Sequence, residues 1–250
     1  MLHGFGGTGH AWDGVAARLR PERYLPLALD LPGHGTMAGE RPITFAACVA
    51  HVLARAPARF ALCGYSLGGR VALQVALGAP RRVTRLVLVS TSPGIEQEPR
   101  RAQRRVADEA LARELENGSF ERFIERWRSQ PLFAGEPEHA GKLAREDHRR
   151  NRPEHLAAAL RGLSPGSMQP LWGSLAQLTM PVAVIAGGRD SAYRDVGRRM
   201  VARLPHARLV VLAGGHALPL ENPRALAEAL EGLDAQSGGR GQLDRARARR

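Results

Sequence analysis

Short apolar runs alternate with longer amphipathic segments over the first ninety residues of the chain. The apolar runs cover residues 24–30, 59–65 and 83–90, and segments of helical length lie near 43–55 and 67–78. Nearly continuous apolar runs are typical of strands that helices cover on both faces. The alternation therefore predicts βαβ units and a mostly parallel sheet.

The pattern changes after Ser90. Charged helical segments without strand signals continue to about Leu171, and the alternation then resumes. The resumed pattern predicts strands at 182–187 and 207–214 and helices near 192–203 and 223–232. A helical insertion between two halves of a parallel sheet is typical of a lid over the edge where ligands bind. We expect an α/β core at 1–92 and 171–233, a helical lid at 93–170, and a tail at 234–250.

The formal net charge is +12, almost all of it from arginine, because Lys142 is the only lysine. Such a balance fits a nucleic acid, an anionic substrate or simple solubility. Part of the charge lies in 235–250, where five arginines and one aspartate occur without aromatic residues, so we expect a disordered basic tail. Much of the rest lies in the predicted lid. No basic stretch is interleaved with aromatic residues, so we do not expect nucleic-acid binding.

The two cysteines, Cys48 in a predicted helix and Cys63 in a predicted strand, lack metal-ligand spacing, and histidines and carboxylates form no HExxH-like cluster. We therefore expect neither a metal nor a cofactor. No apolar run is long enough to cross a bilayer, and glycines interrupt the first ten residues before a signal-peptide core forms. We expect a cytoplasmic protein without a membrane partner; the oligomeric state stays open.

The sequence Gly-Tyr-Ser-Leu-Gly at 64–68 matches G-x-S-x-G, with an apolar strand before it and a helix after it. In this context the glycines leave room for a strained strand-to-helix turn that exposes a serine hydroxyl. The motif predicts that Ser66 is the nucleophile of an α/β-hydrolase fold. The alternative is a glycine-rich turn that holds an ordinary serine.

A serine hydroxyl needs a histidine to accept its proton, and that histidine needs a carboxylate to fix its tautomer. In this fold the order along the chain is serine, acid, histidine. Asp190 and His216 each follow a predicted strand directly, so both lie at the same edge of the sheet as Ser66. We predict a triad of these three residues. Asp195 is the fallback acid, but it falls inside the next helix.

An oxyanion hole in this fold uses the amide after the nucleophile and one amide from an early loop. Leu67 supplies the first, and Phe5, in His-Gly-Phe-Gly-Gly at 3–7, is the natural second. The strand that feeds this loop is reduced to Met1-Leu2-His3. Either the reading frame was started late, or the sheet has an unusual edge.

On these motifs the chain resembles the 2-succinyl-6-hydroxy-2,4-cyclohexadiene-1-carboxylate synthases, pyruvate-eliminating lyases of menaquinone biosynthesis with the α/β-hydrolase fold. The resemblance runs from His3 to about Leu233. Its distinctive parts are GYSLGGR at 64–70, STSPGI at 90–95, RRAQRRVADEALA at 100–112, RWRSQPLF at 126–133, RPEHLAAALRGLSPGSMQPLW at 152–172 and GGRDSAY at 187–193.

The resemblance implies a small anionic substrate with several carboxylates, which the family binds with arginines. Arg70 and Arg104 fall at matching positions, and Tyr65 and Trp127 match aromatic residues of the pocket. The alternatives are a plain surface charge for each arginine and a packing role for Trp127. Arginine suits the task because its planar fork pairs bidentately with a carboxylate.

Two positions depart from the family pattern. His148 stands where a further substrate-binding arginine aligns, with Arg149 and Arg150 beside it, and Arg128 replaces a tyrosine of a related member. We expect His148 and Arg149 to contribute to substrate binding, but the departure puts carboxylate recognition by the third basic residue in doubt.

The resemblance implies elimination of pyruvate from 2-succinyl-5-enolpyruvyl-6-hydroxy-3-cyclohexene-1-carboxylate. We expect proton abstraction next to a carbonyl, with Ser66 relaying the proton to His216 and the two oxyanion amides stabilising the developing enolate. One alternative is a serine carboxylesterase or C–C bond hydrolase with the same triad. Another is a non-catalytic binding protein on this fold, whose basic lid and tail contact nucleic acid.

Overall fold

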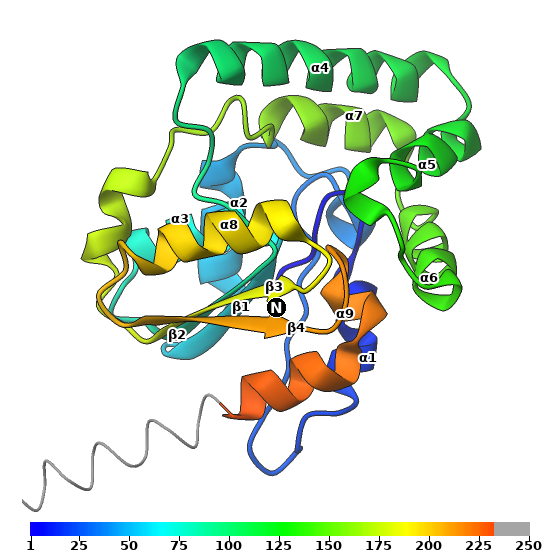
Figure 1. Cartoon of the computed structure of the whole chain (residues 1–250). Helices are drawn as coiled ribbons and strands as arrows, with labels where there is room; N and C mark the ends of the chain where they lie inside the picture. Colours follow the sequence, from blue (N-terminus) through cyan, green and yellow to red (C-terminus); the bar gives the residue numbers. More distant parts are fainter. Residues whose placement is uncertain (233–250) are drawn as a thin grey trace, which may run out of the picture.

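Four strands form the central sheet, in the order β1-β2-β3-β4. They are β1 (Phe60–Tyr65), β2 (Val83–Val89), β3 (Val182–Gly187) and β4 (Ala207–Leu212). The computed structural model describes residues 1–232 and shows these strands in the middle of Figure 1. All three strand pairs are parallel, so the carboxyl ends of the strands share one edge. The predicted parallel sheet is confirmed.

Helices cover both faces of the sheet (Figure 1). One face carries α2 (Phe45–Arg55), α3 (Leu67–Gly78) and α8 (Ser191–Val201), and the other carries α1 (Asp13–Ala16), α9 (Leu218–Glu221) and a helix at 223–232. Short 3-10 turns lie at Gly9–Trp12, Gly35–Met37, Pro131–Phe133 and Trp172–Gln177. Helix α2 begins after Thr44, whose hydroxyl accepts a hydrogen bond from the amide of Ala47 and so caps the helix.

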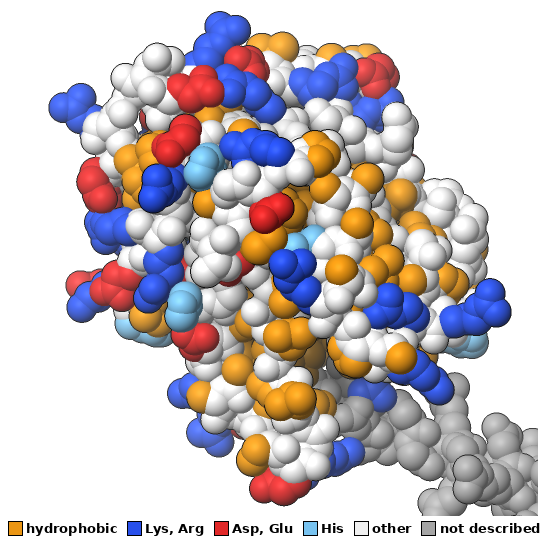
Figure 2. All heavy atoms as spheres, turned by 180° about the vertical axis from the view of Figure 1, so that it is seen from behind, with side chains coloured by type: hydrophobic (Ala, Val, Ile, Leu, Met, Phe, Trp, Pro, Cys, Tyr) orange, Lys and Arg blue, Asp and Glu red, His pale blue; other side chains and the backbone are white. Residues whose placement is uncertain are grey.

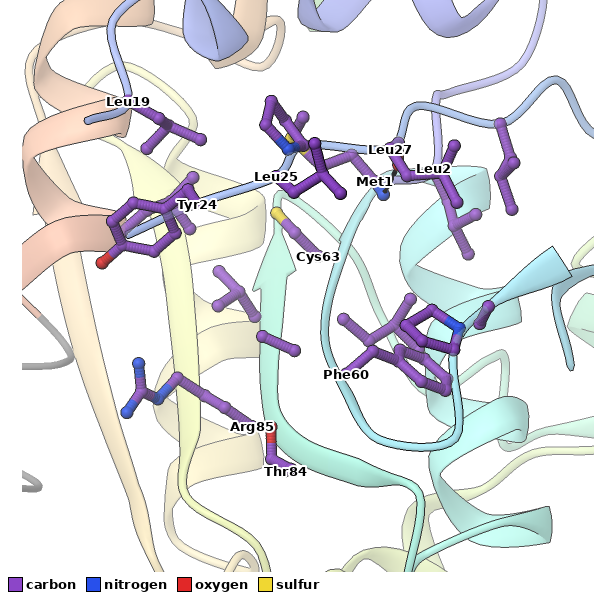
Figure 3. A pocket seen from close by; sticks show the side chains of 18 of the residues that line it. Met1, Leu2, Leu19, Tyr24, Leu25, Leu27, Phe60, Cys63, Thr84 and Arg85 are labelled. Carbon is purple, nitrogen blue, oxygen red and sulfur yellow. Dashed lines mark hydrogen bonds between the residues drawn. The ribbon is translucent and has the colours of Figure 1, made fainter. Parts of the chain in front are cut away.

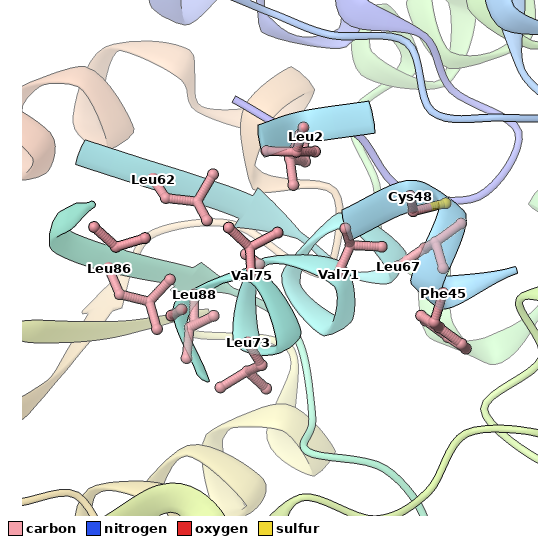
Figure 4. Close-up of a cluster of buried hydrophobic side chains, with 14 of the residues drawn as sticks. Leu2, Phe45, Cys48, Leu62, Leu67, Val71, Leu73, Val75, Leu86 and Leu88 are labelled. Atoms are coloured by element: carbon pink, nitrogen blue, oxygen red, sulfur yellow. The ribbon is translucent and has the colours of Figure 1, made fainter. Parts of the chain in front are cut away.

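Two apolar clusters join these layers, one on each face of the sheet. Leu62 of β1 and Leu88 of β2 lie among side chains of α2 and α3 (Figure 4). The alternate positions Cys63 and Val87 belong to the second cluster, with Trp12. Because successive strand residues point to opposite faces, burial of both faces requires apolar residues at nearly every position. This explains the continuous apolar runs in the sequence.

Between β2 and β3 the structure holds helices and turns. We call residues 93–170 the helical insertion; it contains α4 (Glu98–Asn117), α5 (Phe120–Arg128), α6 (Glu138–His148) and α7 (Pro153–Gly162). Helices α4 and α7 run side by side (Figure 1) and bury Leu115 and Leu156 in a cluster of their own. Helix α6 contacts the Gly9–Trp12 turn and α9, which brings the insertion to the carboxyl edge of the sheet.

The predicted strand at 24–30 is wrong. Its single bridge joins Leu29 to Leu2, which also bridges Gly64 of β1. Leu25 is 98% exposed, and Pro26 has no amide hydrogen to donate to a sheet. A strand needs a neighbouring strand along its whole length to satisfy its backbone groups. Here the only bridging neighbour among residues 1–232 is Leu2, which pairs with Leu29 alone in this segment.

Basic and acidic side chains mix over the face seen in Figure 2, where blue and red atoms alternate around exposed apolar ones. Many charged side chains of residues 1–232 form ion pairs, such as Arg161 with Glu109 and Glu116. Among the helices of residues 1–232, none is long and apolar enough to span a membrane. The predicted basic tail lies outside the described residues.

Candidate active site

Ser66 lies at the sharp turn between β1 and α3. Its backbone angles, φ 51° and ψ −109°, fall in a region that residues with a side chain rarely adopt. The glycines at 64 and 68 allow this turn: a Cβ on Gly64 would lie 2.3 Å from the carbonyl oxygen of Gly68, and one on Gly68 would lie 2.4 Å from that of Leu2. Glycine is therefore required at positions 64 and 68 for a steric reason. A larger residue at either position forces β1 and the segment at Leu2 away from α3.

Ser66, His216 and Asp190 form one chain of contacts at the carboxyl edge of the sheet. The Oγ of Ser66 lies 3.3 Å from Nε2 of His216, and Nδ1 of His216 lies 2.8 Å from Oδ2 of Asp190. Because the carboxylate is an acceptor, Nδ1 carries the proton and Nε2 is left to accept from the serine hydroxyl. The structure thus brings together all three residues of the predicted triad, in the geometry of a base next to a nucleophile.

Local structure fixes the acid and the base. Asp190 follows β3 and is also the N-cap of α8, where its Oδ1 accepts from the amide of Tyr193 at 3.4 Å. The His216 ring is 1% exposed and packs against the rings of Tyr65 and Tyr193, with centroids 5.5 and 4.7 Å away. Glu221 accepts hydrogen bonds from the amides of residues 215 and 217, on either side of the histidine. The imidazole is therefore held from both flanks.

The loop at 3–8 brings a second backbone amide to the site. The amide of Gly7 donates to the carbonyl of Gly4 at 3.1 Å, and Gly6 has φ 74°, as a type II turn requires. Among the backbone hydrogen bonds of residues 1–232, none has the amide of Phe5 or Leu67 as its donor. Both amides of the predicted oxyanion hole are thus without a backbone acceptor, next to Ser66.

Two residues of the helical insertion anchor this loop, and the sequence analysis did not identify them. Asp147 of α6 accepts from the amide of Thr8 at 2.8 Å and from its hydroxyl at 2.5 Å. Asn151 donates to the carbonyl of Gly6 at 2.8 Å. Both partners are more than 130 positions away in sequence, so no local pattern marks them.

A cavity of 60 Å³ lies above Ser66. Its wall includes three of the predicted substrate-binding residues, Tyr65, Trp127 and His148, together with Arg128 and Phe133. Sites for small molecules commonly measure about 300–1,000 Å³. The cavity as observed has room for a few water molecules, so a substrate of the expected size requires the wall to open.

The predicted arginines lie in three different settings. Arg70 of α3 is 8% exposed; its burial lowers its pKa, and nearby Tyr193 opposes this shift. The Nε of Arg104 donates to both carboxylate oxygens of Asp108, with N–O distances of 2.8 and 2.9 Å. Arg149 points away from the cavity into an exposed ion pair with Glu121. None of the three is part of the cavity wall.

His148 is not suited to hold a carboxylate. Its Nδ1 lies 2.7 Å from the carbonyl oxygen of Ala144, so this nitrogen carries the proton and the buried Nε2, which has no partner, is an acceptor. Burial is the main reason why the pKa of His148 is lowered to about 4, and nearby Arg128 and Arg145 lower it further. A neutral ring with an acceptor nitrogen repels a carboxylate oxygen rather than binding it. The structure places His148 in the cavity wall as a hydrogen-bond acceptor, and substrate binding by this residue stays a prediction.

A larger cavity, of 530 Å³, lies away from Ser66, beside the free edge of β1. Leu25, Phe60 and Cys63 contribute to its mostly apolar wall (Figure 3). It contains neither Ser66 nor His216. Burial raises the pKa of the Cys63 thiol to about 12, so this wall carries no ready nucleophile. Among residues 1–232, no group of three or more His, Cys, Asp or Glu residues is arranged to hold a metal ion.

The chain is similar to known proteins over nearly its whole length. The model of the Alpha/beta hydrolase family matches residues 1–229. The 2-succinyl-6-hydroxy-2,4-cyclohexadiene-1-carboxylate synthase of Salmonella typhimurium (strain LT2) is 30% identical over 234 residues, 92% of this chain and 90% of its own. A Bacillus subtilis (strain 168) protein provisionally given the same name is 31% identical, over 89% of this chain and 85% of its own. The structure of MenH from S. aureus matches with a TM-score of 0.84 and 26% identity, over 92% of this chain and 90% of that one.

Proposed function

The chain belongs to the alpha/beta hydrolase family and, within it, to the 2-succinyl-6-hydroxy-2,4-cyclohexadiene-1-carboxylate synthases, and on this premise we propose that it is a lyase of menaquinone biosynthesis. The reaction is elimination of pyruvate from 2-succinyl-5-enolpyruvyl-6-hydroxy-3-cyclohexene-1-carboxylate. The observation that carries the proposal for the site is the contact chain from the Ser66 hydroxyl through His216 to Asp190.

The elimination needs a base and a place for negative charge. The base removes the proton from the ring carbon next to the succinyl carbonyl. The electrons of that C–H bond form a new ring double bond, the existing ring double bond shifts one position toward the carbon that carries the enolpyruvyl group, and the C–O bond to that group breaks. The departing group takes up a proton and leaves as pyruvate. Negative charge develops on the succinyl carbonyl oxygen in the first step, so donors aimed at this oxygen lower the barrier.

We assign these tasks to the residues around Ser66. The Ser66 hydroxyl takes the substrate proton as it passes its own to His216, and Asp190 stabilises the imidazolium that forms. The amides of Phe5 and Leu67 donate to the enolate oxygen. No acyl-enzyme forms on this route, because the serine carries a proton and makes no bond to carbon.

Substrate binding requires positive charge and an opened wall. We keep Arg70 and Arg104 as proposed carboxylate ligands, because Arg70 lies one helical turn after Ser66 and is close enough to Arg104 of α4 for their charges to interact. Arg104 has to leave Asp108 to take part. The helical insertion is the proposed lid, since α5 and α6 supply much of the wall. A cytoplasmic location remains a prediction.

The proposal is tested by incubating the purified protein with the menaquinone-pathway substrate and measuring pyruvate through the NADH consumed by lactate dehydrogenase. We expect pyruvate release that depends on enzyme concentration and is lost in Ser66→Ala. Absence of release from the wild-type protein contradicts the proposal. A protein inactivated by misfolding is recognised by its melting curve.

The second candidate is a serine esterase with the same triad. The strained conformation of Ser66 favours it, because this turn presents the hydroxyl for attack on a carbonyl carbon. An esterase hydrolyses p-nitrophenyl acetate rapidly and passes through an acyl-enzyme. Rapid hydrolysis of p-nitrophenyl acetate, together with no pyruvate release from the menaquinone-pathway substrate, identifies the protein as an esterase.

A further inference from the structure

The guanidinium of Arg128 lies in the catalytic cavity with unused hydrogen-bonding capacity. Arg128 is the last residue of α5, and its side chain is 4% exposed. It belongs to the same cavity wall as Ser66 and His216. Its Cζ lies 3.6 Å from the centroid of the Phe133 ring, and that ring lies 5.9 Å from the ring of His216. The charge therefore lies in the wall of the catalytic cavity, and the Phe133 ring contacts both the guanidinium and the ring of His216.

Arg128 is the one arginine or lysine in the wall of this cavity. Its ion-pair partner among residues 1–232 is Glu136, which is partly buried, and its Nε is buried without any hydrogen-bond partner. A guanidinium has five N–H donors in a planar fork that matches a carboxylate. A buried donor without an acceptor is costly, and in the wall of this cavity the carboxylate of a ligand can supply the acceptor.

His148 and Asp147, which also line this cavity, do not offer the positive charge that a carboxylate needs. His148 presents an acceptor nitrogen, as its contact with Ala144 fixes the proton on the other nitrogen. Asp147 is an anion whose oxygens are already bound to Thr8. Position 128 therefore carries the positive charge that position 148 lacks.

We propose that Arg128 binds a carboxylate of the substrate in this cavity, exchanging its ion pair with Glu136 for the substrate's carboxylate. This specificity role rests on the proposed function. One carboxylate replaces another, so the guanidinium does not lose its counter-charge during the exchange, which avoids the large cost of an unpaired buried ion.

The location of Glu136 allows the exchange. It lies in the turn between Pro131–Phe133 and α6, next to Gly135, which has φ 72°. Arg128 belongs to the wall of the 60 Å³ cavity, and Glu136 lies three residues after Phe133, another residue of that wall. When Glu136 moves outward, it releases the arginine for a carboxylate that enters the cavity.

The test compares variants on one helix and at one ion pair. Arg128→Gln removes the charge and keeps a donor, Arg128→Lys keeps the charge without the fork, and Glu136→Gln removes the competing carboxylate. Arg122→Gln is the matched control, since Arg122 is an exposed arginine of the same helix. The readouts are KM and kcat for pyruvate release, and calorimetric titration with succinate as a simple dicarboxylate probe.

We expect Arg128→Gln to raise KM about tenfold or more and to weaken succinate binding by a similar factor, with a smaller change in kcat. Arg128→Lys recovers part of the loss, and Arg122→Gln matches the wild type. Glu136→Gln binds succinate more tightly than the wild type and gains more thermal stability from it. KM and succinate affinity in Arg128→Gln equal to those in Arg122→Gln overturn the proposal.

A fall in kcat alone, with KM and succinate binding unchanged, also overturns it, because the residue then only positions other groups. If Arg128→Gln does not fold, Glu136→Gln decides: unchanged or weaker succinate binding refutes the exchange. If the wild-type protein releases no pyruvate, the proposed function fails, while the succinate titrations still give the result for Arg128.

Discussion

Replacing Asp147 by asparagine tests whether the helical insertion holds the loop that carries the oxyanion amide of Phe5. The carboxylate of Asp147 accepts from the amide and the hydroxyl of Thr8, one at each oxygen. Asparagine keeps the shape but has one acceptor oxygen, so its amide nitrogen must face one of the two Thr8 donors. The charged acceptor is lost at both contacts, and at one of them the Thr8 group has to accept from the new amide nitrogen, which its hydroxyl can do and its backbone amide cannot.

The size of the effect follows from these contacts. A hydrogen bond to a charged group contributes about 1.5–3 kcal/mol, and in a chain of this length each kcal/mol corresponds to a change in melting temperature of about 2–4 °C. We therefore expect Asp147→Asn to melt roughly 3–12 °C lower. Because loss of one oxyanion donor costs about 10²–10³ in kcat, a displaced Phe5 amide lowers turnover by an amount up to that size.

The assay pairs melting by circular dichroism with kcat for pyruvate release. Glu146→Gln is the control, because Glu146 is the exposed neighbour of Asp147 on α6 and the substitution changes the charge equally. Thr8→Val, which removes the hydroxyl donor, reproduces part of the loss. If Asp147→Asn melts and turns over like Glu146→Gln, the contact to Thr8 does not hold the loop, and the reasoning is refuted.

Ser66→Ala and His216→Ala each lower kcat by several orders of magnitude, and the double variant is little worse than either, because they act as one unit; additive losses measured by pyruvate release contradict the relay. Arg70→Ala lowers kcat/KM by an amount that corresponds to about 2–4 kcal/mol of activation free energy, and Arg70→Lys recovers part of the lost efficiency. If both variants have the kinetics of the wild type, Arg70 does not belong to the site. The lowered pKa of His148, about 4 against 6.5 in the unfolded chain, adds stability that is complete above pH 6.5 and is lost as the pH falls through 4, up to about 3 kcal/mol. Urea unfolding between pH 7.5 and 4 shows a steeper loss for the wild type than for His148→Gln if this is correct, and equal slopes if it is not.

The triad could be predicted from the sequence because a local sequence pattern marks each of its three residues. Ser66 lies in a motif whose glycines are sterically required, and Asp190 and His216 directly follow apolar strands. Parallel strands end at one edge, so three local positions are enough to bring three side chains together. The sheet and its flanking helices were predictable for the same reason, since the apolar periodicity reports burial directly.

The supporting contacts were not accessible, because their partners are distant in sequence. Asp147 and Asn151 look like ordinary polar residues of a charged helix, and nothing near them indicates the loop at 3–8. Likewise, Arg149 and Arg128 both lie in arginine-rich helical segments, but only the packed structure turns one to solvent and the other into the cavity. The segment at 24–30 failed because strand formation depends on a pairing neighbour, which its own composition does not reveal.

The most direct test of the account is a single-turnover measurement of pyruvate formation, with enzyme in excess over substrate that carries deuterium on the ring carbon next to the succinyl carbonyl. The account predicts that the wild-type protein forms pyruvate, more slowly from the deuterated than from the undeuterated substrate, and that Ser66→Ala forms essentially none. It is contradicted if the wild-type protein forms no pyruvate, or if Ser66→Ala forms it at the wild-type rate.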